Sequence, residues 1–156
     1  MFDPDGAGSM RLITACMVCA LLTACGGPSA GPEEALRHWV ANAESAAEGL
    51  DRRSLMATIS ENYADARGND RDAIDKILRL YFLRQKAIVL VMKIDEMTIT
   101  DDTAAEILLT VAGVGTTSRA LGVNADAYQF SLELEMDDDE WMLIGARWGE
   151  LGQKLH

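Results

Sequence analysis

Apolar residues recur at spacings of three and four in three successive stretches of the chain, the period of a helix buried along one face. Pro32, followed by two glutamates, is a favourable start for the first helix, because proline and carboxylates both suit the first turn. Asp51 is expected to cap the second helix, and Asn69 or Asp70 the third, which we expect to run to about Ala87. The apolar stripes are Leu36, Trp39, Val40, Ala43, Ala47 and Leu50, then Leu55, Ile59 and Tyr63, then Ile74, Ile77, Leu78, Tyr81 and Phe82.

From Ile88 onward apolar and polar residues alternate, which is the period of a strand with one buried face. The alternation changes parity near Asp95 and Glu96, since the apolar positions before them are even-numbered, whereas Met97 and Ile99 are odd-numbered. One inserted residue would return all of these side chains to the same face. The sequence therefore predicts a long bent strand with a β-bulge at Asp95 or Glu96.

Three further strands are expected after a turn at residues 101–102. They span Ala104 to about Val111, Tyr128 to Met136, and Trp141 to Trp148, with an acidic turn at residues 137–140 before the last. Helices followed by a strand meander are typical of an α+β domain in which an antiparallel sheet bends around the helices.

The N-terminal segment has the features of an export signal. Arg11 precedes an apolar run over residues 12–22, which is too short to cross a bilayer as a permanent helix. The run ends in Leu22-Thr23-Ala24-Cys25, which resembles the lipobox of bacterial lipoproteins, where the cysteine sulfur accepts a diacylglycerol. We therefore expect cleavage between Ala24 and Cys25 and a lipid on Cys25. Acidic residues are unusual ahead of such a signal, and those before residue 10 favour Met10 as the true start.

The export signal divides the chain into four parts. Residues 1–24 are the expected signal peptide, 25–32 the lipidated cysteine with a flexible glycine-rich tether, 33–150 the folded domain, and 151–156 a C-terminal tail. Without residues 1–24 the chain keeps 13 of its 14 basic and 23 of its 25 acidic residues, a net charge of −10. Such a charge, without a basic stripe, disfavours nucleic acid and anionic lipid as partners. The acyl chains on Cys25 are the expected attachment to the membrane.

Two strings resemble the nuclear transport factor 2-like (SnoaL-like) superfamily. They are residues 59–82, ISENYADARGNDRDAIDKILRLYF, and residues 140–148 of the terminal hairpin, EWMLIGARW. Together with the order of elements, the resemblance extends over roughly residues 33–150. It implies a cystatin-like cone, in which three N-terminal helices pack in the concavity of a strongly curved antiparallel sheet. Members of the superfamily include dehydratases, isomerases and cyclases with acids in the cone, and also non-enzymatic domains that bind a ligand or a partner.

If the cone is catalytic, the candidate acid–base residues are Tyr63, Asp65 and Arg147. The resemblance implies that Tyr63 and Asp65, at the end of the second helix, open toward the cone and exchange a proton with a small substrate. The alternative is structural, with Tyr63 in the core and Asp65 capping a turn. Steroid isomerases of the superfamily use a tyrosine on the first helix, where this chain has His38 and Trp39, and this departure counts against the steroid-isomerase pattern of residues.

We expect neither a metal nor a cofactor. His38 lies on the solvated side of its helix and the other histidine, His156, is the last residue, so the two form no ligand cluster. The acidic turn 137–140 lacks the spacing of a calcium loop. Residues 113–117, GVGTT, superficially resemble a phosphate loop but lack its lysine and its following helix, so we expect a hairpin loop there.

Aromatic side chains are the candidate ligand contacts, namely Trp39, Tyr63, Tyr81 and Tyr128. The last strand, 141–148, is apolar on both faces, with Trp141 and Leu143 on one side and Met142, Ile144, Ala146 and Trp148 on the other. One face must cover the helices, and the other then needs cover of its own. The candidates for that cover are the neighbours of the third strand, a second subunit or another partner. Dimerisation through the outer sheet face is common in the superfamily that this chain resembles, so the resemblance implies a homodimer as one candidate.

These features favour an envelope lipoprotein whose cone binds a small apolar ligand or a protein partner without catalysis. The alternative is an envelope enzyme of the dehydratase, isomerase or cyclase type. A carboxylate, tyrosine or arginine pointing into the cone would favour the enzyme, and an apolar cone the binding protein. Gly26 stands where aspartate would retain a lipoprotein of enteric bacteria in the inner membrane, so we expect the periplasmic face of the outer membrane if the source has one.

Overall fold

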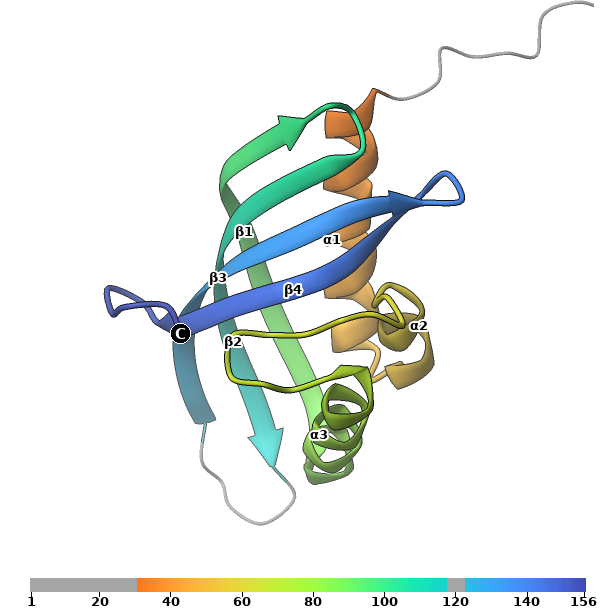
Figure 1. The fold of residues 1–156 in the computed structure, drawn as a ribbon. Coiled ribbons are helices and arrows are strands. Elements are labelled where there is room, and N and C mark those ends of the chain that lie inside the picture. The colour runs from red at the N-terminus through yellow and green to blue at the C-terminus, as the bar shows by residue number, and fades with distance from the viewer. Residues whose placement is uncertain (1–30, 118–122) are drawn as a thin grey trace, which may run out of the picture.

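The computed structural model describes residues 31–117 and 123–156, which form three helices followed by four strands (Figure 1). In chain order these are α1 (Pro32–Glu48), α2 (Arg52–Ala57), α3 (Arg71–Arg84), β1 (Gln85–Thr100), β2 (Ala104–Thr117), β3 (Val123–Asp137) and β4 (Glu140–Glu150). The strands form one antiparallel sheet in the order β1-β2-β3-β4, which curves around α1 (Figure 1). The predicted α+β cone is confirmed. The expected export signal, Cys25 and the expected tether before Gly31 lie outside the described residues.

The helices begin where the sequence predicts. Pro32 occupies the first turn of α1, and the carboxylates of Asp51 and Asp70 accept backbone N–H groups at the starts of α2 and α3. The third helix ends at Arg84 and not near Ala87, because the chain passes directly into β1. No helix of the described ranges is long and apolar enough to span a membrane.

The predicted bulge in β1 is confirmed. Pairing with β2 continues from Ile94 to Glu96 and skips Asp95, which is the inserted residue. As a consequence the side chains of Met92 and Met97 both pack against the hydrophobic core, although five positions separate them. The bulge therefore bends β1 while keeping one apolar face toward the helices.

Replacing Met97 with aspartate is expected to lower the free energy of unfolding by about 2 kcal/mol, because it places a carboxylate among apolar side chains. The matched control is Val91→Asp on the opposite face of β1, where the side chain is 64% exposed. In urea unfolding, the free energy of unfolding of this control should fall by less than about 0.5 kcal/mol. Equal losses in the two variants would show that the assignment of faces is wrong.

The second helix is shorter than predicted, and the expected helical stripe through Ile59 and Tyr63 is wrong. Residues 58–66 run beside β4, where the N–H groups of Ser60 and Ala64 donate to carbonyls of that strand. Ile59 and Tyr63 are nevertheless buried in the core. The edge of β4 supplies backbone partners to this segment, and that tertiary interaction overrides the local apolar spacing.

A second bulge, in β4, was not predicted. Pairing with β3 shifts around Ile144, which is the extra residue. The shift brings both halves of the strand to the same side, and the residues that pack on the core are Trp141, Leu143, Ala146 and Trp148. The bulge thus explains why core-facing apolar residues occur at both odd and even positions of this strand.

The glycine-containing segment 113–117 is part of β2, so the predicted hairpin loop is wrong. It pairs with β1 on one side and with β3 on the other. A Cβ atom on Gly113 would lie 2.9 Å from Cδ2 of Leu90 on the neighbouring strand. This glycine therefore leaves space for the side chain of Leu90 inside the cone. In the sequence, the glycine instead suggests a turn.

Candidate ligand-binding cavity

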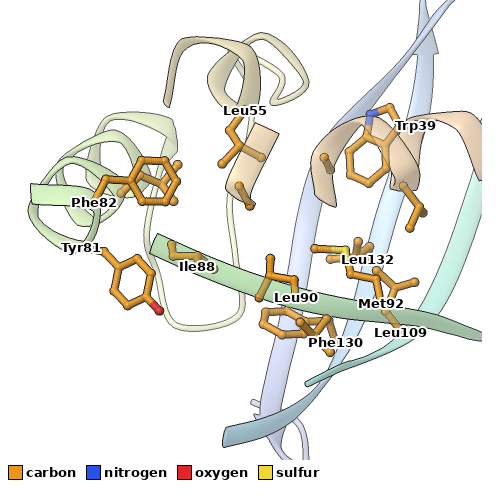
Figure 2. Close-up of a pocket in the computed structure, with 15 residues that line it drawn as sticks. Trp39, Leu55, Tyr81, Phe82, Ile88, Leu90, Met92, Leu109, Phe130 and Leu132 are labelled. Atoms are coloured by element: carbon orange, nitrogen blue, oxygen red, sulfur yellow. The ribbon is translucent and has the colours of Figure 1, made fainter. Parts of the chain in front are cut away.

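A cavity of about 310 Å³ lies between the helices and the inner face of the sheet. Figure 2 shows Leu55 of α2 and Phe82 of α3 on one side, Trp39 of α1 on the other, and β1 between them. The described lining residues are Trp39, Val40, Ala43, Ala47, Leu55, Leu78, Tyr81, Phe82, Ile88, Leu90, Met92, Leu109, Val111, Phe130 and Leu132.

The regular spacing of residues in helices and strands directs these side chains into the cavity. Leu78 and Phe82 are four residues apart on α3 and so lie on one side of that helix, while the strand residues lie at alternate positions of one sheet face. On α1 the residues Ala43 and Ala47 face the same space. Their small side chains leave unfilled a volume that leucine or phenylalanine would occupy.

The lining is chemically uniform. No carboxylate, amide or cation is among the described lining residues. Nε1 of Trp39 is buried without a hydrogen-bond partner in the described parts of the chain, and Tyr81 is 47% exposed, which places it at the mouth. The interior therefore offers hydrocarbon and aromatic surface.

Two carboxylates hold α1 against the sheet beside the cavity. Glu44 accepts the backbone N–H of Met92 at 3.0 Å, and Glu48 accepts that of Leu90 at 2.9 Å. Because β1 is an edge strand, these N–H groups would otherwise face outward without a strand partner. The two contacts thus cover the edge and fix the wall of the cavity.

No protein-family model and no curated protein matches the sequence. Solved structures share the fold. A proposed scytalone dehydratase from Novosphingobium aromaticivorans has a TM-score of 0.68 at 12% identity, covering 79% of this chain and 89% of that one. A proposed dehydratase of the NTF2-like family from Streptomyces avermitilis has a TM-score of 0.67 at 10% identity, and the match covers 78% of this chain and 97% of the dehydratase. A ketosteroid isomerase-like protein from Erwinia carotovora atroseptica has a TM-score of 0.63 at 14% identity, covering 76% and 95%.

The chain has the nuclear transport factor 2-like fold. The predicted resemblance is thereby confirmed at the level of the fold. Identities this low establish no shared activity, so function has to be argued from the side chains that this NTF2-like cone contains.

Tyr63 and Asp65 lie together but do not line the cone of this NTF2-like domain. Asp65 is buried and accepts the N–H groups of Arg67 at 2.9 Å and Asn69 at 2.8 Å, and also Nδ2 of Asn69 at 2.8 Å. The carboxylate thus caps the turn that leads into α3. Burial, together with the neighbouring Asp65 carboxylate, raises the pKa of Tyr63 above its ordinary value, so its hydroxyl stays protonated at neutral pH.

The raised pKa of Tyr63 predicts a loss of stability in alkali. Because the folded state holds this proton more tightly, the contribution is complete below about pH 10, where the unfolded tyrosine ionises, and decreases as the pH rises above it. Urea unfolding at several pH values between about 8 and 11 should show a steeper loss for the wild type than for Tyr63→Phe. Tyr81→Phe, at an exposed position, is the control and should follow the wild type. Equal slopes for all three proteins would contradict the prediction.

Arg147 lies on the outer face of the sheet, so its predicted place in the cavity is wrong. Its guanidinium is 3.0 Å from Oε1 of Glu106, 3.1 Å from Oγ of Ser131 and 3.5 Å from Oε1 of Glu133. The bulge at Ile144 is the cause, since strict alternation from the start of β4 would have turned Arg147 inward. The homodimer expected on this outer face stays a prediction.

Of the four aromatic residues predicted to contact a ligand, Trp39 and Tyr81 line the cavity, whereas Tyr63 and Tyr128 do not. The ring of Tyr128 lies beside that of Phe130, with centroids 6.5 Å apart, and Phe130 takes the lining position. The remaining lining residues were classed only as core. The apolar spacing of these residues is evident in the sequence. That the small side chains of Ala43 and Ala47 leave a cavity open is evident only from the structure.

A second hollow, between α2 and α3, has a volume of about 420 Å³ and is lined mainly by charged side chains. Arg52 bonds to Asp75 there, and Arg71 donates to the carbonyls of Met56 and Ile59. These contacts tie the two helices and the following loop together. Their structural role explains the charges in this hollow.

Proposed function

We propose that this protein is a lipid-anchored protein of the bacterial cell envelope whose NTF2-like domain binds a small apolar ligand without transforming it. The composition of the cavity carries the proposal, because its described lining is hydrocarbon, aromatic and thioether, apart from the indole N–H of Trp39 and one hydroxyl at the mouth. General acid–base catalysis needs a titratable group within hydrogen-bond reach of the reacting atoms. Tyr63, Asp65 and Arg147, the candidates for the enzymatic alternative, lie elsewhere.

Anchoring and location rest on the sequence. The lipobox ending at Cys25 supports a lipid anchor, and Gly26 supports the outer membrane where the source has one. A protein partner remains the other kind of occupant for such a domain, but an apolar cavity of about 310 Å³ favours a small molecule over a protein side chain.

The size and polarity of the cavity restrict the ligand. At about 30 Å³ for each small group, 310 Å³ accommodates on the order of ten non-hydrogen atoms. A charged ligand is disfavoured, because its desolvation would not be offset by any charged or amide group in the described lining. We therefore expect a neutral molecule bound mainly through the hydrophobic effect, with an affinity on the order of micromolar.

The small neutral fluorophore 1-naphthylamine, whose fused aromatic rings are within the size that the cavity accommodates, tests this proposal. Its fluorescence should rise saturably with the wild-type protein, and Ala47→Trp should weaken binding at least about tenfold because the indole fills the cavity. The matched control is Ala41→Trp, which places the same side chain on the exposed side of α1 and should leave binding unchanged. Equal binding by both variants would place the probe outside the cavity and contradict the proposal.

A further inference from the structure

Helix α3 is apolar on two opposite sides. Its inner side contributes Leu78 and Phe82 to the cavity, yet none of its residues is fully buried. Its outer side carries Ile77, Leu80 and Leu83, whose side chains are 49%, 56% and 77% exposed. Amphipathic helices of soluble domains place polar residues on the solvent side, so these exposed side chains need an explanation.

The same segment concentrates positive charge in an acidic protein. Between residues 76 and 86 the chain has four basic residues and no carboxylate, against a net charge of −11 for the whole sequence. These residues, Lys76, Arg79, Arg84 and Lys86, are all exposed, and none forms a salt bridge with another described residue. By contrast, Arg71 at the start of α3 forms a salt bridge with Glu61, and Arg52 of α2 forms one with Asp75 of α3. The overall charge conceals this local basic segment.

Helical geometry interleaves the cations with the apolar side chains. Residues three and four apart lie on one side of a helix, so Lys76, Leu80, Leu83 and Arg84 face outward together. We call Lys76, Ile77, Arg79, Leu80, Leu83 and Arg84 the α3 surface. Its composition is that of a helix lying in a membrane interface, where apolar groups enter the acyl boundary and cations meet lipid phosphates.

We propose that the α3 surface docks on a lipid bilayer that contains anionic headgroups. A second copy of the chain is a poorer occupant, because a two-fold contact between α3 surfaces would bring like charges together. Anionic headgroups instead neutralise the unpaired cations while the acyl region takes up the leucines. This inference goes beyond the proposed function and does not require that the cavity be occupied.

Docking through α3 would orient the domain. Figure 1 shows α3 beside the C-terminal end of α1, whereas the chain enters α1 at its opposite end, about 25 Å away at the rise of a helix. An anchor at Cys25 and the α3 surface would therefore hold the domain lengthwise on the membrane. Because Leu78 and Phe82 lie on the inner side of the same helix, the cavity would open close to the bilayer, and an apolar ligand could pass between them with little exposure to water.

A nitroxide label on the outer side of α3 tests the docking. The full chain, with Cys16, Cys19 and Cys25 replaced by serine, would carry one label through Leu83→Cys, and a control protein would carry it through Glu135→Cys on the exposed outer face of the sheet. Collisions of the label with oxygen, which concentrates in lipid, and with a water-soluble nickel complex would be measured on vesicles. The vesicles are phosphatidylcholine alone or phosphatidylcholine with phosphatidylglycerol.

On vesicles with phosphatidylglycerol, the label at position 83 should become several-fold less accessible to nickel and more accessible to oxygen, while the control label stays in water. Each cation contributes about fivefold to binding at an anionic surface, so reversing Lys76, Arg79 and Arg84 to glutamate should return the label to water. A label at position 83 that stays in water on these vesicles would overturn the proposal. If the label becomes less accessible to nickel without vesicles, and increasingly so with protein concentration, the α3 surface contacts a second copy of the chain. If its accessibility to nickel falls equally on both vesicle types, docking does not depend on anionic headgroups. None of these results depends on binding of the fluorophore, so this proposal and the proposed function can fail separately.

Discussion

Replacing Cys25 with serine is expected to abolish incorporation of labelled palmitate and to leave an uncleaved precursor. The expected modification is a thioether, which requires the sulfur of a cysteine, and serine offers only a far weaker oxygen nucleophile at the same place. In a lipoprotein pathway cleavage follows lipidation, so the loss should be complete and not partial. The measurement is metabolic labelling of cells, with gel mobility to distinguish precursor from mature protein.

The chain supplies matched controls for this experiment. Cys16 and Cys19 lie in the same N-terminal segment but outside the lipobox, so Cys16→Ser and Cys19→Ser should incorporate palmitate as the wild type does. Labelling that persists in Cys25→Ser, or that disappears in either control, would contradict the assignment of Cys25 as the lipidated residue.

The order and boundaries of most elements could be predicted because they depend on local chemistry. Carboxylate caps mark the starts of α2 and α3, and a change of parity marks the bulge at Asp95. The failures depend on neighbours distant in sequence. Residues 58–66 leave the helical path because the edge of β4 binds their backbone, and β2 extends through Thr117 because strands on both sides pair with it.

The candidate site was predicted less well, and one undetected bulge accounts for much of the error. A single inserted residue at Ile144 reverses which side chains of β4 face the cone, which removes Arg147 from the cavity. In β1 such an insertion was evident because polar and apolar residues alternate clearly there, but the second half of β4 has apolar residues in both parities. Local sequence therefore could not distinguish a bulged strand from a strand with two apolar faces.

The basic segment on α3 was missed for a different reason. A net charge of −10 for the chain without residues 1–24 hides four cations within residues 76–86. The apolar spacing predicts one buried stripe on this helix, Ile74, Ile77, Leu78, Tyr81 and Phe82, and leaves Leu80 and Leu83 unassigned. The structure separates the two groups, with Leu78 and Phe82 facing the cavity and Leu80 and Leu83 facing outward.

The residues of the enzymatic alternative can be tested without knowing a substrate. Replacing Asp65 with alanine is expected to lower the free energy of unfolding by about 3 kcal/mol, because three donors lose a charged acceptor in a buried turn. Asn69→Ala removes only one of these donors and should have a smaller effect. The control is Asp51→Ala, which removes an exposed helix cap and should lower stability by about 1 kcal/mol.

Chemical denaturation of these variants distinguishes a structural carboxylate from a catalytic one. If the role of Asp65 is structural, the stability of Asp65→Asn should lie between those of the wild type and Asp65→Ala. The remaining side-chain oxygen can still accept the two backbone N–H groups, but the new NH2 group faces the side-chain amide of Asn69. A catalytic acid is commonly replaced without loss of stability, because function and not folding retains it. If Asp65→Ala were as stable as the wild type, the turn would not depend on the carboxylate, and the acid–base interpretation of Tyr63 and Asp65 would regain support.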